Sequence, residues 1–261
     1  MGGLLPRLRS AVFVLWLAAT VIPWAIFCLI ASVFVRGTPL YWFTMRCLRM
    51  AIWGAKVICG VRYRIVGLDR LQTADRSGPI VLLPKHQSTW ETFAFPTLMP
   101  HPLCYVFKRE LLWVPFFGWA MARLDMIHID RSRRNEAWNR VAEQGQAHMA
   151  KGNWVIMFPE GTRIPRGEQG VYKNGGTRLA CTTGASVLPI AVNSARCWPR
   201  KSFVLRPGLI DISIGPTIPS AGREPEELMR EVEAWIEAEM RRIDPEAYTP
   251  GVPTPVAKAR H

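Results

Sequence analysis

Residues Ala11 to Val35 constrain the fold of this chain most strongly, because none of these 25 residues carries a charge. As a helix the stretch would be about 37 Å long, which is enough to cross the hydrocarbon core of a bilayer. A signal peptide would have a shorter apolar core followed by a small-residue cleavage site, so this alternative is disfavoured. Pro23, in the middle of the stretch, predicts a kink. We therefore expect a helix in contact with a membrane.

A second apolar and aromatic segment, Tyr41 to Val61, differs from the first because it contains three basic residues, Arg46, Arg49 and Lys56. Their spacings of three and seven residues place them near one face of a helix. Such a helix is typical of a membrane interface, or of a membrane-spanning helix with snorkelling basic side chains, although it could also pack on a soluble domain. Because the first 60 residues carry six Lys or Arg and no acidic residue, we expect residues 1–61 to be a two-helix membrane-binding segment.

The stretch from Ile80 to Glu91 combines a strand pattern with a histidine at its end. Ile80 to Leu83 is a short apolar run typical of a buried strand, and His86 follows it after a proline and a lysine. Ser88 and Glu91 have the Ser-x-x-Glu spacing of a capping box. Glu91 could therefore cap the following helix, or it could orient the His86 ring as a triad carboxylate orients its base. Because ligands bind outside the carboxyl ends of strands in open α/β sheets, His86 is a candidate general base.

Residues Trp154 to Arg163 repeat this design, with an apolar run followed by a proline, a glycine and polar side chains. The residues after the proline are Glu160, Gly161, Thr162 and Arg163. An arginine at a strand end suits a phosphate, because its planar guanidinium makes paired, charge-assisted hydrogen bonds. The stretch therefore predicts an anion-binding position.

Together these stretches resemble the glycerolipid acyltransferase family, and most closely the 1-acylglycerol-3-phosphate acyltransferases. The family motif His-x-x-x-x-Asp is matched by His86 to Glu91, with Glu in place of Asp, and Phe-Pro-Glu-Gly-Thr-Arg is matched without change by Phe158 to Arg163. Between them, Lys108 to Gly118 resembles the block Lys-x-Glu-Leu-x-x-x-Pro-x-x-Gly, and Ile129 to Arg131 matches the Ile-Asp-Arg that often closes it. Val187 to Ile190 resembles the last family motif, and all of these motifs occur in the family's order.

The resemblance implies a three-layer α/β fold over residues 60–220 and acyl transfer from a thioester to lysophosphatidic acid. The donor would be acyl-CoA or acyl-ACP, the acceptor the free 2-hydroxyl, and the product phosphatidic acid for phospholipid synthesis. His86 would take the proton of the hydroxyl, a contribution of about 10²–10⁴-fold, and Glu91 would hold the ring tautomer. Backbone amides near Gly161 or Gln87 would stabilise the oxyanion.

The resemblance also implies how the acceptor is held. The phosphate would be bound by basic residues, and the expected substrate-binding set is Lys108, Arg109, Arg131, Glu160, Gly161, Thr162 and Arg163. Neither a cofactor nor a metal is expected, because the thioester is a co-substrate and the attack on it is direct.

The net charge indicates the kind of partner, and the cysteines indicate the redox compartment. A net charge of +13 indicates an anionic partner, but no zinc-finger spacing, RNA-recognition motif or long basic run points to nucleic acid. We therefore expect membrane lipids and anionic substrates as partners. The six cysteines form no Cys-x-x-Cys, which favours a reducing compartment without disulfides or zinc.

Strand and helix patterns alternate outside the motifs, which favours an α/β fold: a mixed sheet flanked by helices on both faces over residues 62–243. Strands are also predicted over Arg62–Val66, Leu103–Phe107, Met126–Ile129, Ser186–Val192 and Leu209–Ile214. Helices are predicted over Glu91–Leu98, Arg134–Lys151, Thr177–Thr183 and Pro225–Ile243. Gly67–Gly78 and a mobile basic segment, Ile164–Gly176, are predicted loops. The proline-rich residues 244–261 are predicted to be a disordered tail.

Three other functions compete with this one. A hydrolase could use Ser88, but that residue lies two positions from His86 and lacks a nucleophile elbow. A membrane-surface protein that only binds lipid would explain the first 60 residues, but it leaves Phe158 to Arg163 without a role. An acyltransferase acting on another lyso-lipid would use the same motifs.

The attachment to the membrane follows from the basic residues if the acyl thioesters are cytosolic. A single crossing by Ala11 to Val35 would place Arg7 and Arg9 outside, against the positive-inside rule. Two spans would put the three basic residues of Tyr41 to Val61 in the bilayer, at a cost of about 2.5–3.5 kcal/mol for each residue near the centre. We therefore expect both helices to lie in one leaflet on the cytoplasmic face of the inner (cell) membrane, with two spans as the alternative.

Overall fold

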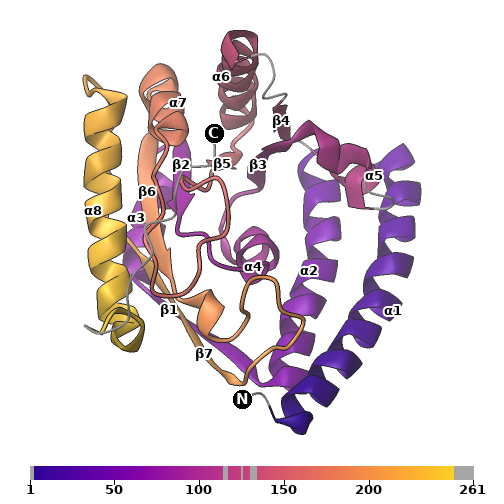
Figure 1. Cartoon of the computed structure of the whole chain (residues 1–261). Helices are drawn as coiled ribbons and strands as arrows, with labels where there is room; N and C mark the ends of the chain where they lie inside the picture. Colours follow the sequence, from indigo (N-terminus) through magenta and orange to yellow (C-terminus); the bar gives the residue numbers. More distant parts are fainter. Residues whose placement is uncertain (1–2, 114–116, 125, 130–133, 250–261) are drawn as a thin grey trace.

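The computed structural model describes residues 3–113, 117–124, 126–129 and 134–249, and its centre is a seven-stranded sheet in the order β1-β7-β6-β2-β5-β3-β4 (Figure 1). The strands are β1 Val61–Val66, β2 Ile80–Pro84, β3 Leu103–Lys108, β4 Ile127–Ile129, β5 Trp154–Ile156, β6 Ser186–Val192 and β7 Gly208–Ile214. Neighbouring strands pair in parallel except β6 with β7, which are antiparallel. The predicted mixed sheet is confirmed.

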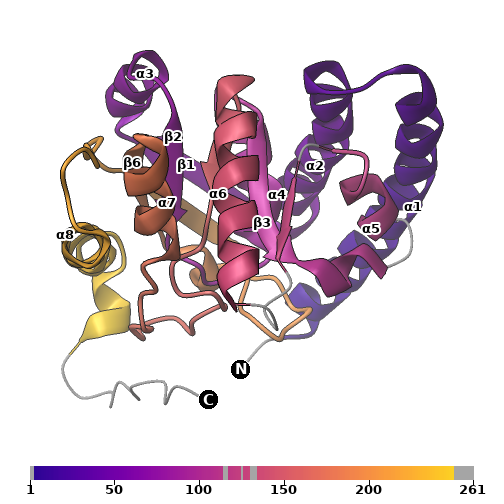
Figure 2. The ribbon, with the colours of Figure 1, turned by 90° about the horizontal axis from the view of Figure 1, so that it is seen from above.

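Helices cover both faces of the sheet (Figures 1 and 2). Two of them, α2 (Thr38–Cys59) and α4 (Trp90–Leu98), belong to the core on one face. The opposite face is covered by α6 Arg134–Ala150, α7 Gly175–Thr183 and α8 Pro225–Ile243.

The unbroken apolar run of β2 follows from this layering. Ile80 and Leu82 join the core beneath α2 and α4, whereas Val81 and Leu83 join the core beneath α7 and α8. All four side chains are fully buried. Successive side chains of a strand point to opposite faces, so a strand covered on both sides needs an apolar residue at every position. The predicted buried strand is therefore confirmed.

The two N-terminal helices form a hairpin at one end of the molecule, with α1 (Leu4–Phe34) outside α2 (Figure 2). Among the described residues, α1 is the one helix long and apolar enough to cross a membrane, and only 11% of its most apolar window is buried. A Cβ on Gly54 would lie 2.3 Å from the Trp16 ring, so the close approach of the two helices requires a glycine there. The hairpin is also tied to the sheet domain, because the Leu205 backbone N–H donates to Ser10 Oγ at 2.9 Å.

Three predicted loops or tails turn out to be structured. The polar stretch 67–78 contains helix α3, Leu68–Arg76, which was missed because the segment is short and polar overall and buries only Leu71 and Ala74. Residues 244–249, assigned to a disordered tail, contain the 3-10 helix η3, Pro245–Tyr248, which packs against α8. Residues 250–261 lie outside the described residues.

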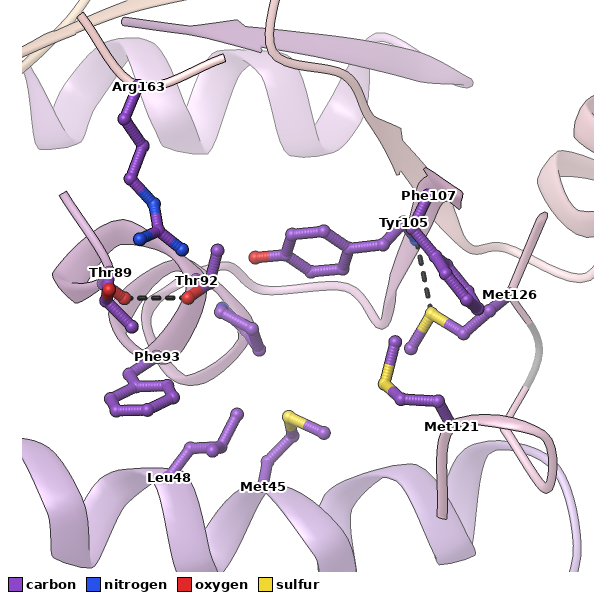
Figure 3. A pocket seen from close by; sticks show the side chains of 11 residues that line it. Met45, Leu48, Thr89, Thr92, Phe93, Tyr105, Phe107, Met121, Met126 and Arg163 are labelled. Atoms are coloured by element: carbon purple, nitrogen blue, oxygen red, sulfur yellow. Dashed lines mark hydrogen bonds between the residues drawn. The ribbon is translucent and has the colours of Figure 1, made fainter. Parts of the chain in front are cut away.

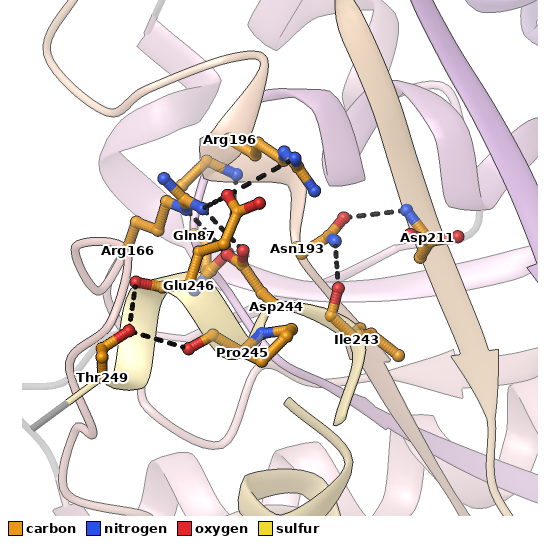
Figure 4. Close-up of polar contacts among 11 residues, drawn as sticks. Gln87, Arg166, Asn193, Arg196, Asp211, Ile243, Asp244, Pro245, Glu246 and Thr249 are labelled. Carbon is orange, nitrogen blue, oxygen red and sulfur yellow. Dashed lines mark hydrogen bonds and ion pairs between the residues drawn. The ribbon is translucent and has the colours of Figure 1, made fainter. Parts of the chain in front are cut away.

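The third is the segment Ile164–Gly176, predicted to be mobile. It is fixed by its contacts with the C-terminal residues (Figure 4). The Arg166 guanidinium donates two parallel hydrogen bonds to the buried Asp244 carboxylate, at 2.7 and 2.6 Å. At Gly167, an added Cβ would meet the Ala247 carbonyl oxygen at 2.4 Å. Such bidentate pairs are strong and geometrically specific, so they hold this loop in one position against the C-terminal residues.

Candidate active site

The polar residues after β2 are almost completely buried, which is unusual for charged and polar side chains. His86, 9% exposed, lies with its ring nitrogen Nδ1 2.9 Å from Glu91 Oε2. Its ring stacks on Phe158, with ring centroids 3.8 Å apart and an angle of 21° between the planes. A carboxylate can only accept, so this contact holds the proton on Nδ1 and leaves Nε2 free to take another. The two predicted catalytic residues are therefore in contact.

Glu91, in the first turn of α4, contacts the histidine and also accepts from the turn before the helix, so the two predicted contacts are not alternatives. Its carboxylate accepts hydrogen bonds from the backbone N–H groups of Ser88, at 2.9 and 3.1 Å, and of Gln87, at 3.2 Å. It also accepts a hydrogen bond from the Ser194 hydroxyl. The Ser88 hydroxyl in turn accepts from the Trp90 N–H at 3.0 Å and is fully buried. Ser88 thus lies in the turn before α4 with its hydroxyl engaged, which does not support a hydrolase that uses it as nucleophile.

A buried ionic cluster holds His86 from the other side. Glu160 Oε2 accepts from the His86 backbone N–H at 2.9 Å, and Glu160 Oε1 pairs with Lys85 Nζ at 2.6 Å. Lys85 Nζ also lies 2.6 Å from Glu237 Oε1, which accepts from the Tyr172 hydroxyl at 2.8 Å. Burial raises the pKa of the Glu160 carboxyl, and Lys85 opposes this shift. Glu160 is 3% exposed and its carboxylate faces Lys85 and the His86 backbone in this structure, so its contact with a substrate stays a prediction.

The strand order explains why these groups meet. β2 lies between β6 and β5, so the residues after all three strands come to one edge of the sheet. Ser194 follows β6, and Glu160 follows β5. The Ile164 backbone N–H also donates to the His86 carbonyl at 2.8 Å, which binds the loop after β5 to both backbone groups of His86.

The remaining expected substrate residues divide into two groups. Arg163 lines a cavity, while Gly161 and Thr162 are exposed beside it in sequence. The side chains of Lys108 and Arg109, and the whole of Arg131, lie outside the described parts of the structure. The expected oxyanion donors are both engaged, because the Gly161 N–H donates to the Phe158 carbonyl and the Gln87 N–H to Glu91. In this conformation neither amide is available to an oxyanion.

An apolar cavity of about 300 Å³ lies between α2, α4, β3 and α5, Phe117–Met121 (Figure 3). Its lining is mainly methionine, aromatic and aliphatic: Met45, Leu48, Phe93, Pro96, Tyr105, Phe107, Met121 and Met126. Thr89, Thr92 and Arg163 supply the polar lining. Figure 3 shows the Arg163 guanidinium pointing toward Thr92. The arrangement offers an apolar compartment with a cation at one side.

Tyr105 brings a polar atom to this cavity that the sequence did not single out. Its hydroxyl is buried and has no hydrogen-bond partner among the described residues, and burial raises the pKa of the phenol. Its ring lies 6.4 Å from Phe158, the ring on which His86 stacks. An unpaired buried hydroxyl is costly, so a bound molecule that accepts its hydrogen bond would gain affinity.

The model of the acyltransferase family matches residues 62–193. The chain belongs to the acyltransferase family. It is 42% identical to a 1-acyl-sn-glycerol-3-phosphate acyltransferase of Pseudomonas aeruginosa, over 91% of this chain and 92% of that one. A human 1-acyl-sn-glycerol-3-phosphate acyltransferase alpha is 28% identical over 74% of this chain and 67% of its own length.

Among solved structures, the 1-acyl-sn-glycerophosphate acyltransferase of Thermotoga maritima has the same fold as this acyltransferase. The TM-score is 0.73 with 20% sequence identity, and the match covers 92% of this chain and 98% of that one. The predicted fold and the resemblance read from the motifs are confirmed. Among the described residues there is no group of three or more His, Cys, Asp or Glu that could hold a metal ion.

Proposed function

We propose that this acyltransferase moves a fatty acyl group from acyl-CoA or acyl-ACP to the 2-hydroxyl of 1-acylglycerol 3-phosphate, giving phosphatidic acid. The observation that carries the proposal is the contact of His86 Nδ1 with Glu91 Oε2 at 2.9 Å beside an apolar cavity. The His86 ring stacks on Phe158, and Phe158 lies next to Tyr105, which lines that cavity together with Arg163. The names of the relatives support the same acceptor.

The chemistry needs only this chain's residues and the two substrates. His86 Nε2 takes the proton of the acceptor hydroxyl while its oxygen attacks the thioester carbonyl carbon. The carbon–sulfur bond then breaks, and the imidazolium returns the proton to the thiolate that leaves. Glu91 stabilises the imidazolium between these steps, as the carboxylate does in a hydrolytic triad. The products are phosphatidic acid and a free thiol.

The lining of the apolar cavity suits a fatty acyl chain of a substrate. Its methionine and aromatic lining offers an environment for an acyl chain, and each buried methylene would contribute about 0.8 kcal/mol. Arg163 would bind the acceptor's phosphate, and Tyr105 would donate a hydrogen bond to a substrate oxygen. Lys108, Arg109 and Arg131 remain proposed phosphate ligands on the strength of the family motifs.

The proposed location is the cytoplasmic face of the cell membrane, with both N-terminal helices in one leaflet. Most of α1 exposes apolar side chains. α2 is different, because Met45 and Leu48 line the cavity and the Tyr41 hydroxyl donates to the Pro96 carbonyl of α4 at 3.2 Å. A helix packed along the domain in this way fits poorly with an independent second span.

A thiol-release assay tests the proposed reaction against its two rivals. Acyl transfer predicts release of thiol from acyl-CoA only when lysophosphatidic acid is present. A hydrolase would release thiol without any acceptor, and a lipid-binding protein would release none. Repeating the assay with acyl-ACP and with other lyso-lipids identifies the carrier and the acceptor.

A further inference from the structure

A second hollow, of about 660 Å³, lies between the later part of α2, the end of α4 and the first residues of β1 and β7. It shares no lining residue with the apolar cavity near His86. Its lining combines three basic residues with an apolar and aromatic surface: Arg49, Ile52, Trp53, Lys56, Arg62, Tyr63, Thr97, Leu98 and Leu209. We refer to it as the basic hollow.

The three cations of the basic hollow have no paired carboxylate among the described residues. Arg49, Lys56 and Arg62 are exposed, and no carboxylate in the described part of the chain forms an ion pair with any of them. Arg64, two residues further along β1, does pair with Asp211 at 2.6 Å. Three like charges around one hollow repel each other and attract an anion, and low-dielectric walls strengthen this field.

The surroundings indicate where that anion comes from. Trp53, between Arg49 and Lys56 on α2, is 56% exposed, and Val57 beside it is 59% exposed. Helix α1, which packs along α2, presents an apolar surface to its surroundings. Exposed tryptophan and basic side chains next to an apolar helix are the pattern of the headgroup layer of a membrane.

We propose that the basic hollow binds the phosphate of an anionic glycerophospholipid of the membrane, at a site separate from the catalytic one. The guanidinium and ammonium groups would hold the phosphate oxygens, and Trp53 would lie among the glycerol and acyl carbons. The proposal uses the membrane attachment proposed above and does not depend on the acyl-transfer reaction. The bound lipid would fix the orientation of the helix hairpin on the surface from which the acceptor arrives.

The test compares binding to vesicles of phosphatidylcholine alone with binding to vesicles of phosphatidylcholine mixed with phosphatidylglycerol. The variant replaces all three cations, Arg49→Gln, Lys56→Gln and Arg62→Gln. A matched control removes the same charge from exposed positions on α3, α6 and α8, through Arg76→Gln, Arg140→Gln and Arg230→Gln. Sedimentation measures the partition coefficient of each protein at fixed salt.

The site predicts that the hollow variant loses about 100-fold in binding to the mixed vesicles, or about fivefold for each basic residue, and little on phosphatidylcholine. The control should change less than about threefold, because its residues lie off the membrane helices. Equal losses in both variants would overturn the proposal, since net charge alone would then explain them. An unchanged preference of the hollow variant for vesicles with phosphatidylglycerol would also overturn the proposal.

Two further measurements distinguish a lipid site from a catalytic role of the three cations and from a site for a soluble phosphate. Thiol release with acceptor dispersed in detergent should be the same for wild type and hollow variant, and its loss would place these cations in the catalytic site. An unchanged rate also shows that the variant is folded, and a wild-type melting temperature separates a catalytic loss from misfolding. Glycerol 3-phosphate should not displace the wild type from mixed vesicles; displacement at the concentration of the competing lipid would assign the hollow to a soluble phosphate and overturn the lipid site.

Discussion

Ser194 donates its hydroxyl hydrogen bond to Oε1 of Glu91, the carboxylate whose other oxygen faces Nδ1 of His86. The two residues are 103 positions apart and both are fully buried. A serine, a carboxylate and a histidine are thus connected by hydrogen bonds across the ends of two neighbouring strands. We infer that Ser194 is a positioning residue, because it is connected to the histidine through Glu91.

Replacing Ser194 with alanine tests this relationship. The carboxylate loses one of its donors and gains freedom to rotate, so kcat should fall about tenfold while KM for both substrates changes little. The lost buried hydrogen bond should cost about 1 kcal/mol of stability. Steady-state kinetics and thermal melting measure the two effects. A lower melting temperature with unchanged kcat would reduce Ser194 to a purely structural residue.

Tyr105→Phe tests whether the unpaired hydroxyl in the apolar cavity contacts the substrate. The variant removes one oxygen atom that makes no hydrogen bond in the described part of the protein, so the melting temperature should stay the same or rise. Turnover should fall about tenfold if the hydroxyl donates to a substrate oxygen. Activity equal to that of the wild type would show that this hydroxyl has no part in the reaction.

Arg163→Ala tests the assignment of the acceptor's phosphate. KM for lysophosphatidic acid should rise by about 10- to 100-fold, because a charge-assisted contact contributes about 1.5–3 kcal/mol. KM for the acyl donor should change little. Arg163→Lys, which keeps the charge but loses the planar guanidinium, is the matched comparison. Its KM for lysophosphatidic acid should lie between those of the wild type and Arg163→Ala. An increase confined to the donor would reassign Arg163 to the phosphates of the coenzyme.

The attachment of the helix hairpin can be tested with one cysteine at its turn, in a variant whose six native cysteines have been replaced. Thr38 suits this better than Gly37, whose φ of 66° would strain a cysteine. One-leaflet attachment predicts that an impermeant thiol reagent labels Thr38→Cys from the cytosolic side only. Labelling from outside intact cells would show that α1 crosses the bilayer.

Much of the fold could be predicted because its strands and helices have strong local patterns. The run Ile80–Leu83 is apolar at every position because both faces of β2 are covered, and the apolar stripe of Pro225–Ile243 matches α8. The elements that were missed give weaker signals: α3 is short, polar overall and buries only two side chains, and residues 244–249 are held by the ion pair of Asp244 with Arg166. That interaction joins residues 78 positions apart, which no local pattern reveals.

The sequence motifs predicted the residues of the site that lie within them, but not the contacts between distant segments. The spacing of His86 and Glu91 left two roles open for the carboxylate, and the family motif favoured the contact with His86 that the structure contains. Ser194 and Glu160 reach them because β6 and β5 flank β2 in the sheet, and that order is a property of the topology. Glu160 was assigned to the substrate together with the rest of its motif, and its side chain turns inward to Lys85 and to the His86 backbone.

The central claim is that His86 is the general base, and the most direct measurement is the turnover of purified His86→Ala in the thiol-release assay with lysophosphatidic acid. The side chain is 11% exposed and its contacts are with the Glu91 carboxylate and the Phe158 ring, at the surface of the cluster, so the variant should keep the melting temperature within a few degrees and the vesicle binding of the wild type. The account predicts that its turnover falls by at least about 10²-fold. Turnover close to that of the wild type, in a folded and membrane-bound variant, would contradict the account.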